Sequence, residues 1–155
     1  MKIRAVKHNN RKKTFEIRTS TKTLVLPFSR AYPRPTVADP VRESFLDEEV
    51  GREAFTYVLD SGRTGTVHVE QVLEYNQDPS YLRNLLLYRL TIEAQKRANA
   101  SPLSKRELVR RLGTSATQLY RILDQTNYRK SVDQVLALLQ VLNCEVDLVV
   151  RTKSA

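Results

Sequence analysis

Residues 104–143 read SKRELVRRLGTSATQLYRILDQTNYRKSVDQVLALLQVLN, and this stretch decides the fold of the C-terminal half. It holds three serines that are each followed, three positions later, by Glu or Gln. In such a capping box the serine oxygen accepts from a backbone amide, and the later side chain reaches back to the cap. Each pair precedes an apolar pattern of helical period, which predicts helices over 105–112, 116–123 and 132–142. The pairs are Ser104 with Glu107, Ser115 with Gln118, and Ser131 with Gln134.

The connection between the first two of these helices is a short turn that contains glycine. Gly113 can close a helix in the left-handed conformation without steric cost. The next helix is capped by Ser115, only two residues later. Two short helices joined by so short a turn cross steeply, as in a helix-turn-helix. We therefore predict this motif over residues 105–123.

The second helix of the motif has an outer face suited to double-stranded DNA. Leu119, Ile122 and Leu123 would be buried, and the other face is small at its start and long, polar or basic further on. Small residues let a helix enter the major groove, and Gln and Arg can bond base edges in two places. The outer residues are Ala116, Thr117, Gln118, Tyr120, Arg121 and Gln125.

The segment ELVRRLGTSATQLYRIL, residues 107–123, resembles the λ-repressor-like (XRE-type) helix-turn-helix family of bacterial repressors and antitoxins. The resemblance covers residues 104–143, with Val109 and Thr114 as departures from the family's pattern. It implies a homodimeric transcriptional repressor that reads the major groove with helix 116–123. Base contacts are then expected from Ala116, Thr117, Gln118, Tyr120 and Arg121. Phosphate contacts are expected from Lys105, Ser115, Asn127, Tyr128, Arg129 and Lys130.

Asp78 and Pro79 mark the boundary between two predicted domains, residues 1–78 and 79–155. Asp is a good helix cap, and Pro is tolerated at the first helical position. Leucines at three- and four-residue spacing then predict a long helix from Pro79 to about Ala100. Because this helix holds more leucine than one buried face needs, we expect it to bridge both domains or to face a second subunit.

The first 75 residues carry a β-rich pattern. Phe15 and Ile17 alternate with polar neighbours, as in a half-buried strand. The proline-rich loop after residue 30 should hold no central strand, and the acidic cluster at 47–53 is expected to be a solvated loop or a helix start. This half faintly resembles a small bacterial α+β domain of unknown function. Further strands are predicted at 3–6, 23–28, 55–59 and 64–69, with a short helix at 69–75.

Residues 145–151, EVDLVVR, alternate Val146, Leu148 and Val150 on one face, which predicts a C-terminal strand. An unpaired strand is a liability, so we expect it to pair with its counterpart in a second subunit or with the N-terminal sheet. The predicted fold class is α+β, with a small β-rich N-terminal domain followed by an all-α, λ-repressor-like helix-turn-helix domain with a C-terminal strand.

The net charge of +9 is concentrated in the C-terminal half. Residues 1–79 hold 13 Lys and Arg against 11 Asp and Glu, whereas residues 80–155 hold 13 against 6. A basic excess attracts polyanions such as DNA. The alternative is an ordinary basic surface that maintains solubility, on a plain helical bundle that binds nothing.

The sequence predicts no catalytic, metal or cofactor site, and hence no enzyme. His8 and His68 are sixty residues apart, and four glycines leave no phosphate-binding loop. The absence of a long apolar run predicts no membrane partner, and the single Cys144 favours a cytoplasmic location. The alternative function is a protein-interaction module, such as an antitoxin whose N-terminal domain masks a toxin-like partner.

Overall fold

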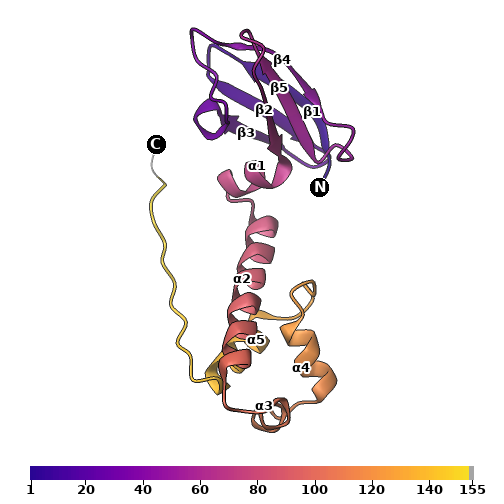
Figure 1. The fold of residues 1–155 in the computed structure, drawn as a ribbon, viewed down its shortest axis with the longest axis vertical. Coiled ribbons are helices and arrows are strands. Elements are labelled where there is room, and N and C mark those ends of the chain that lie inside the picture. Colours follow the sequence, from indigo (N-terminus) through magenta and orange to yellow (C-terminus); the bar gives the residue numbers. More distant parts are fainter. Residues whose placement is uncertain (154–155) are drawn as a thin grey trace. The chain divides into compact units, whose positions relative to one another are not determined.

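The structure is a computed structural model that describes residues 1–153, and it divides into two compact units (Figure 1). The first unit is residues 1–82, and the second begins at Arg83. Within the described residues six strands precede the α-helices, and the division falls inside α2 (Pro79–Ala100). No helix within residues 1–153 combines the length and the apolar character needed to cross a bilayer.

The first unit contains two three-stranded antiparallel sheets. Their inner faces share one core, in which the ring of Phe15 lies 4.8 Å from that of Phe28 and 5.0 Å from those of Phe55 and Tyr57, measured between centroids. One sheet is β1 (Ile3–Asn9), β2 (Thr14–Thr19) and β3 (Thr23–Pro27), and the other is β4 (Val41–Leu46), β5 (Ala54–Leu59) and β6 (Thr64–His68).

The two sheets adjoin along β1 and β4. There the side chain of Asn10 pairs with the backbone of Val41 as a neighbouring strand would. Its amide donates to the carbonyl of Val41 and its oxygen accepts from the Val41 amide, both at 2.9 Å. His8 Nδ1 lies 2.9 Å from Ser44 Oγ in the same seam. The short helix α1 (Val69–Tyr75) packs on β3 and β6 and completes the core.

Tyr57 anchors the proline-rich loop to this core. Its hydroxyl donates to the carbonyl oxygen of Pro33 at 2.7 Å, and burial raises the pKa of Tyr57 to about 12, so the hydroxyl remains a donor. A Cβ atom at Gly65 on the neighbouring strand would lie 2.3 Å from the Tyr57 oxygen, so the position of the ring requires glycine there. The loop after residue 30 is thereby held against the sheets.

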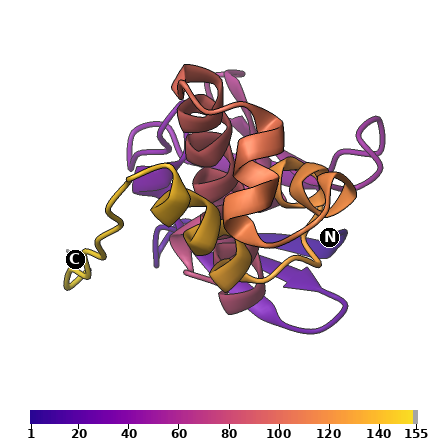
Figure 2. The same cartoon turned by 90° about the horizontal axis from the view of Figure 1, so that it is seen from below.

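The second unit is built from helices. Residues of α3 (Lys105–Leu112), α4 (Ala116–Leu123) and α5 (Val132–Val141) gather around the C-terminal part of α2 (Figure 2). Leu108, Leu119 and Ile122 face Leu87 and Ala94 of α2 in one buried cluster, together with Val135, Leu138 and Leu139 of α5. The predicted helices at 105–112 and 116–123 are confirmed, and the third ends one residue earlier than predicted.

The predicted fold class is wrong in its description of the C-terminal half. The chain is α+β with two three-stranded sheets ahead of the helices, and α2 begins within the first unit, where Tyr81 packs against the sheet core. The helices therefore do not form the all-α, λ-repressor-like domain with a C-terminal strand that the sequence predicted. Residues 144–153 contain no strand, and Leu148 and Val150 are 76% and 83% exposed. Alternation alone does not make a strand, because its backbone needs a hydrogen-bonded partner.

One strand of the first half was not predicted from the sequence. The strand β4 was missed, because Val41 and Leu46 enclose charged and polar residues that hide the apolar alternation. The acidic cluster is an exposed turn region between β4 and β5, which confirms the solvated loop, one of the two forms expected for it. The remaining strands and α1 lie close to the predicted ranges, because their alternation and turn residues are local signals.

Candidate nucleic-acid interface

The helix α3 begins as the capping pattern predicted, but its capping box is only half formed. Ser104 Oγ accepts from the Glu107 amide at 3.2 Å. The Glu107 carboxylate does not return to the cap, because it pairs with the guanidinium groups of Arg110 and Arg111. Hydrogen bonds from Arg110 and then Arg111 lower the pKa of Glu107 to about 2. These two arginines are therefore partly neutralised by their own helix.

A tight turn presents the start of α4. Gly113 adopts the left-handed conformation with φ of +65°, and its amide donates to the Arg110 carbonyl. Two residues later Ser115 Oγ accepts from the Gln118 amide at 3.1 Å. Ser115 itself is exposed, so the first turn of α4, whose remaining amide donors carry a partial positive charge, faces outward.

The two faces of α4 are as different as its sequence predicted. Leu119 and Ile122 are buried in the core of the second unit. The opposite face is open, and the Tyr120 side chain is 56% exposed. Gln118 differs from the other residues assigned to bases because it is half-buried. The exposed members of that set are Ala116, Thr117, Tyr120 and Arg121.

A cation lies at the edge of this open face. The Nζ atom of Lys105, the first residue of α3, lies 4.9 Å from the centroid of the Tyr120 ring. Attraction between an ammonium and the face of an exposed aromatic ring contributes about 0.5–1 kcal/mol. The contact joins the two helices of the motif and places positive charge beside Tyr120.

The C-terminal end of α4 is held by three side chains. Helix ends leave carbonyl groups without partners inside the helix. Gln95 of α2 donates to the Leu123 carbonyl at 2.7 Å, and Asn127 donates to the Arg121 carbonyl at 3.1 Å. Lys130 Nζ donates to the carbonyls of Ile122 and Asp124, both at 2.7 Å. With four consecutive carbonyls bonded in this way, the orientation of α4 is tightly defined.

These contacts correct two of the residues assigned to phosphate. Lys130 is only 4% exposed, so its side chain caps the helix and does not face solvent. The same burial lowers the pKa of its ammonium. The side chain of Asn127 is half-buried, its oxygen accepts from the Arg129 amide, and its nitrogen caps α4. Neither residue is retained among the phosphate contacts.

The other residues assigned to phosphate are on the surface. Lys105, Ser115, Tyr128 and Arg129 are exposed, the last two in the loop that follows α4. Arg83 of α2 fixes this loop by donating to the Tyr128 carbonyl at 3.1 Å. The supporting roles of Arg83 and Gln95 were missed from the sequence, because both residues lie far from the motif along the chain.

Comparison of the chain with protein-family models, curated proteins and solved structures gives no match. The resemblance of residues 104–143 to the helix-turn-helix family stays a prediction, and the functional argument rests on the residues themselves.

Proposed function

We propose that this chain is a homodimeric, sequence-specific DNA-binding repressor that inserts α4 into the major groove. The main support for this proposal is the combination of an open face and a fixed end on α4. The open face of α4 displays Thr117, Tyr120 and Arg121, while the far end of the same helix is fixed through four capped carbonyls. A helix that reads bases must hold its side chains in register with the base edges, and rigid anchoring serves that need.

The side chains of the open face suit base edges. Arg121 can donate two hydrogen bonds to the O6 and N7 atoms of guanine, and the methyl group of Thr117 can contact the methyl of thymine. Ala116 is small enough to let the start of the helix approach the base pairs closely. Gln118 is half-buried, so it has less reach than its neighbours in this proposal.

Phosphate contacts would supply affinity and orientation. Lys105 stands beside the open face, and the exposed Arg129 lies in the loop after α4. The exposed start of α4 at Ser115 adds backbone amides, which favour a phosphate group. The excess of 13 basic over 6 acidic residues in 80–155 has the sign needed to attract DNA.

The direct test is binding to DNA at two salt concentrations. We expect the full chain to shift a duplex from the region upstream of its own gene, and to bind it more weakly at the higher salt. The variant Thr117→Ala/Arg121→Ala should lose preference for that duplex over a scrambled one. The matched variant Arg97→Ala removes an exposed charge on α2, beside Glu93, and should keep the preference. Equal binding of both duplexes by the wild-type chain would refute the proposal.

The homodimer is tested by the form of the site. Two copies of a helix-turn-helix read half-sites about 34–36 Å apart, one turn of DNA. We therefore expect selected sequences to contain an inverted repeat, and light scattering to give the mass of two chains. A single half-site bound by one chain would exclude the dimer.

A protein-interaction module is the second candidate function. In the first unit Tyr32 and Val37 are both 86% exposed on the proline-rich loop. Exposed aromatic side chains are frequent anchors of protein interfaces. A partner that co-purifies with the wild-type chain but not with Tyr32→Ser would favour this function. A partner that binds both chains equally would count against the surface at Tyr32.

A further inference from the structure

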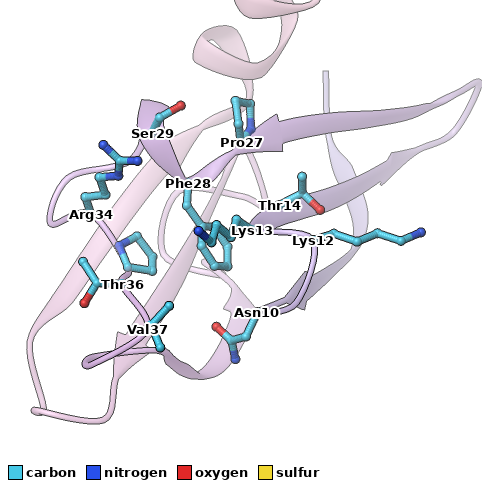
Figure 3. A pocket seen from close by; sticks show the side chains of 11 residues that line it. Asn10, Lys12, Lys13, Thr14, Pro27, Phe28, Ser29, Arg34, Thr36 and Val37 are labelled. Atoms are coloured by element: carbon cyan, nitrogen blue, oxygen red, sulfur yellow. The ribbon is translucent and has the colours of Figure 1, made fainter. Parts of the chain in front are cut away.

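The first unit contains a cleft that the proposed DNA contact does not use. Its volume is about 560 Å³, within the range of roughly 300–1,000 Å³ typical of small-molecule sites. Three segments form its walls: the turn between β1 and β2, the chain around Phe28 at the end of β3, and the loop at residues 34–37 (Figure 3). Such a concave site suits a small ligand better than an extended duplex.

The cleft is lined by positive charge and hydroxyl groups. Lys12, Lys13 and Arg34 contribute the charge, and among the described lining residues there is no carboxylate. In Figure 3 the side chain of Lys12 extends away from the other side chains, which leaves Lys13 and Arg34 as the principal cations. Hydroxyl donors are supplied by Thr14, Ser29 and Thr36.

The walls are formed in advance by contacts outside the cleft. The Phe28 amide donates to the Lys13 carbonyl at 2.9 Å, which ties the hairpin turn to the end of β3. Asn10 is fixed by its double contact with Val41, and the loop is anchored by the bond from Tyr57 to Pro33. A site that exists before its ligand arrives binds with less loss of conformational freedom.

The backbone at Lys13 adopts a turn conformation that bears on how this lysine can be tested. Its φ is +56°, a left-handed conformation in which glycine or asparagine is less strained than lysine. The same conformation occurs in the turns at Arg52, Gln77 and Asn143, so it does not by itself indicate a ligand. It does allow the ammonium of Lys13 to be removed by a change to glycine that keeps the turn.

From these observations we infer that the cleft binds a small phosphorylated molecule, a phosphate monoester. The planar guanidinium of Arg34 and the compact ammonium of Lys13 are the two cations that proteins use on phosphate, and the hydroxyl groups can donate to its remaining oxygens. The exposed apolar side chain of Val37 would contact the organic part of the ligand. The inference does not depend on the proposed function, because the site lies in the first unit and its test measures the binding of phosphate.

The test is an NMR titration of the full chain with inorganic phosphate and with phenyl phosphate, at constant ionic strength set with chloride. We expect saturable shifts of the amides around residues 10–14, 27–29 and 34–37, with phenyl phosphate binding more tightly than inorganic phosphate. Shifts that rise linearly without saturation, or that chloride alone reproduces, would overturn the inference. So would a duplex DNA that shifts these same amides more strongly than either phosphate.

Two variants separate binding from folding. Lys13→Gly removes the ammonium and relieves the left-handed backbone, so the fold should be at least as stable while phosphate binds about tenfold more weakly. Arg34→Gln should weaken binding to a similar degree. The matched control is Arg52→Gly, which removes another basic residue with positive φ, 65°, outside this cleft. Equal weakening by Arg52→Gly would overturn the inference.

Discussion

Lys130 Nζ lies 2.7 Å from the carbonyl oxygen of Ile122, within the last turn of α4. A lysine that the sequence places in a basic loop is therefore part of the internal framework of the second unit. Its ammonium also donates to the carbonyl of Asp124, so it supplies a partner to two carbonyls that have none within the helix. The helix proposed to read DNA is oriented in part by this contact.

Replacing Lys130 should destabilise the chain. Lys130→Met keeps an unbranched apolar stem but removes both hydrogen bonds, so the free energy of unfolding should fall by about 1–3 kcal/mol. Urea unfolding followed by circular dichroism would measure this. Arg129→Met changes the exposed neighbour and should alter stability by no more than about 0.5 kcal/mol. Equal effects of the two substitutions would contradict the capping role.

The salt dependence of DNA binding should distinguish Lys105 from Lys130. Each phosphate neutralised adds about 0.9 to the slope of log affinity against log salt concentration. We expect Lys105→Gln to reduce this slope by about one, and Lys105→Arg to preserve it. Lys130→Met should leave the slope unchanged in the protein that remains folded, and a slope reduced by Lys130→Met would mean that its ammonium reaches the DNA.

Arg121 should supply preference for one base pair. Arg121→Ala removes an exposed guanidinium, while the backbone carbonyl of the same residue stays capped by Asn127. We expect a loss of about 1–3 kcal/mol on the preferred site and relaxed choice at a single position. Fluorescence anisotropy with every base pair tested at each position would show it. A loss of equal size on all sequences would place Arg121 on the DNA backbone instead.

The carboxylate of Glu107 should contribute to stability in a defined pH range. Its pKa is lowered to about 2 from the ordinary value of 4.5, so the unfolded chain binds more protons between these values. The contribution is therefore fully present above about pH 4.5 and is lost as the pH falls toward 2. The difference in unfolding free energy between wild type and Glu107→Gln should decrease as the pH falls from 4.5 to 2. Added salt should also decrease it, since the contacts of Glu107 with the two arginines are at the surface. A difference that does not change with pH would show that Glu107 acts through packing alone.

Removal of the C-terminal segment should leave the helical unit intact. Residues 145–153 are exposed and form neither helix nor strand. A chain that ends at Cys144, which still packs at the edge of the core, should unfold within about 0.5 kcal/mol of the full chain. Thermal unfolding of the two chains would provide the comparison. A clear loss of stability would indicate that the segment contributes to the fold of this unit.

The sequence by itself determined the helices around the proposed DNA contact. The caps at Ser104, Ser115 and Ser131 and the glycine at 113 act on groups within a few residues, so their effect can be recognised without knowledge of the fold. The alternation of apolar residues in most strands of the first unit is local in the same sense.

Only the tertiary structure decided which charges are free and which segments find partners. Gln95 reaches the carbonyl of Leu123 across 28 positions of sequence, and Lys130 is buried because the chain after α4 returns to the end of that helix. The segment at 145–151 has the alternation of a strand but no neighbouring strand among the residues described. Burial and strand pairing depend on atoms distant in sequence, and a local sequence pattern does not predict where those atoms lie.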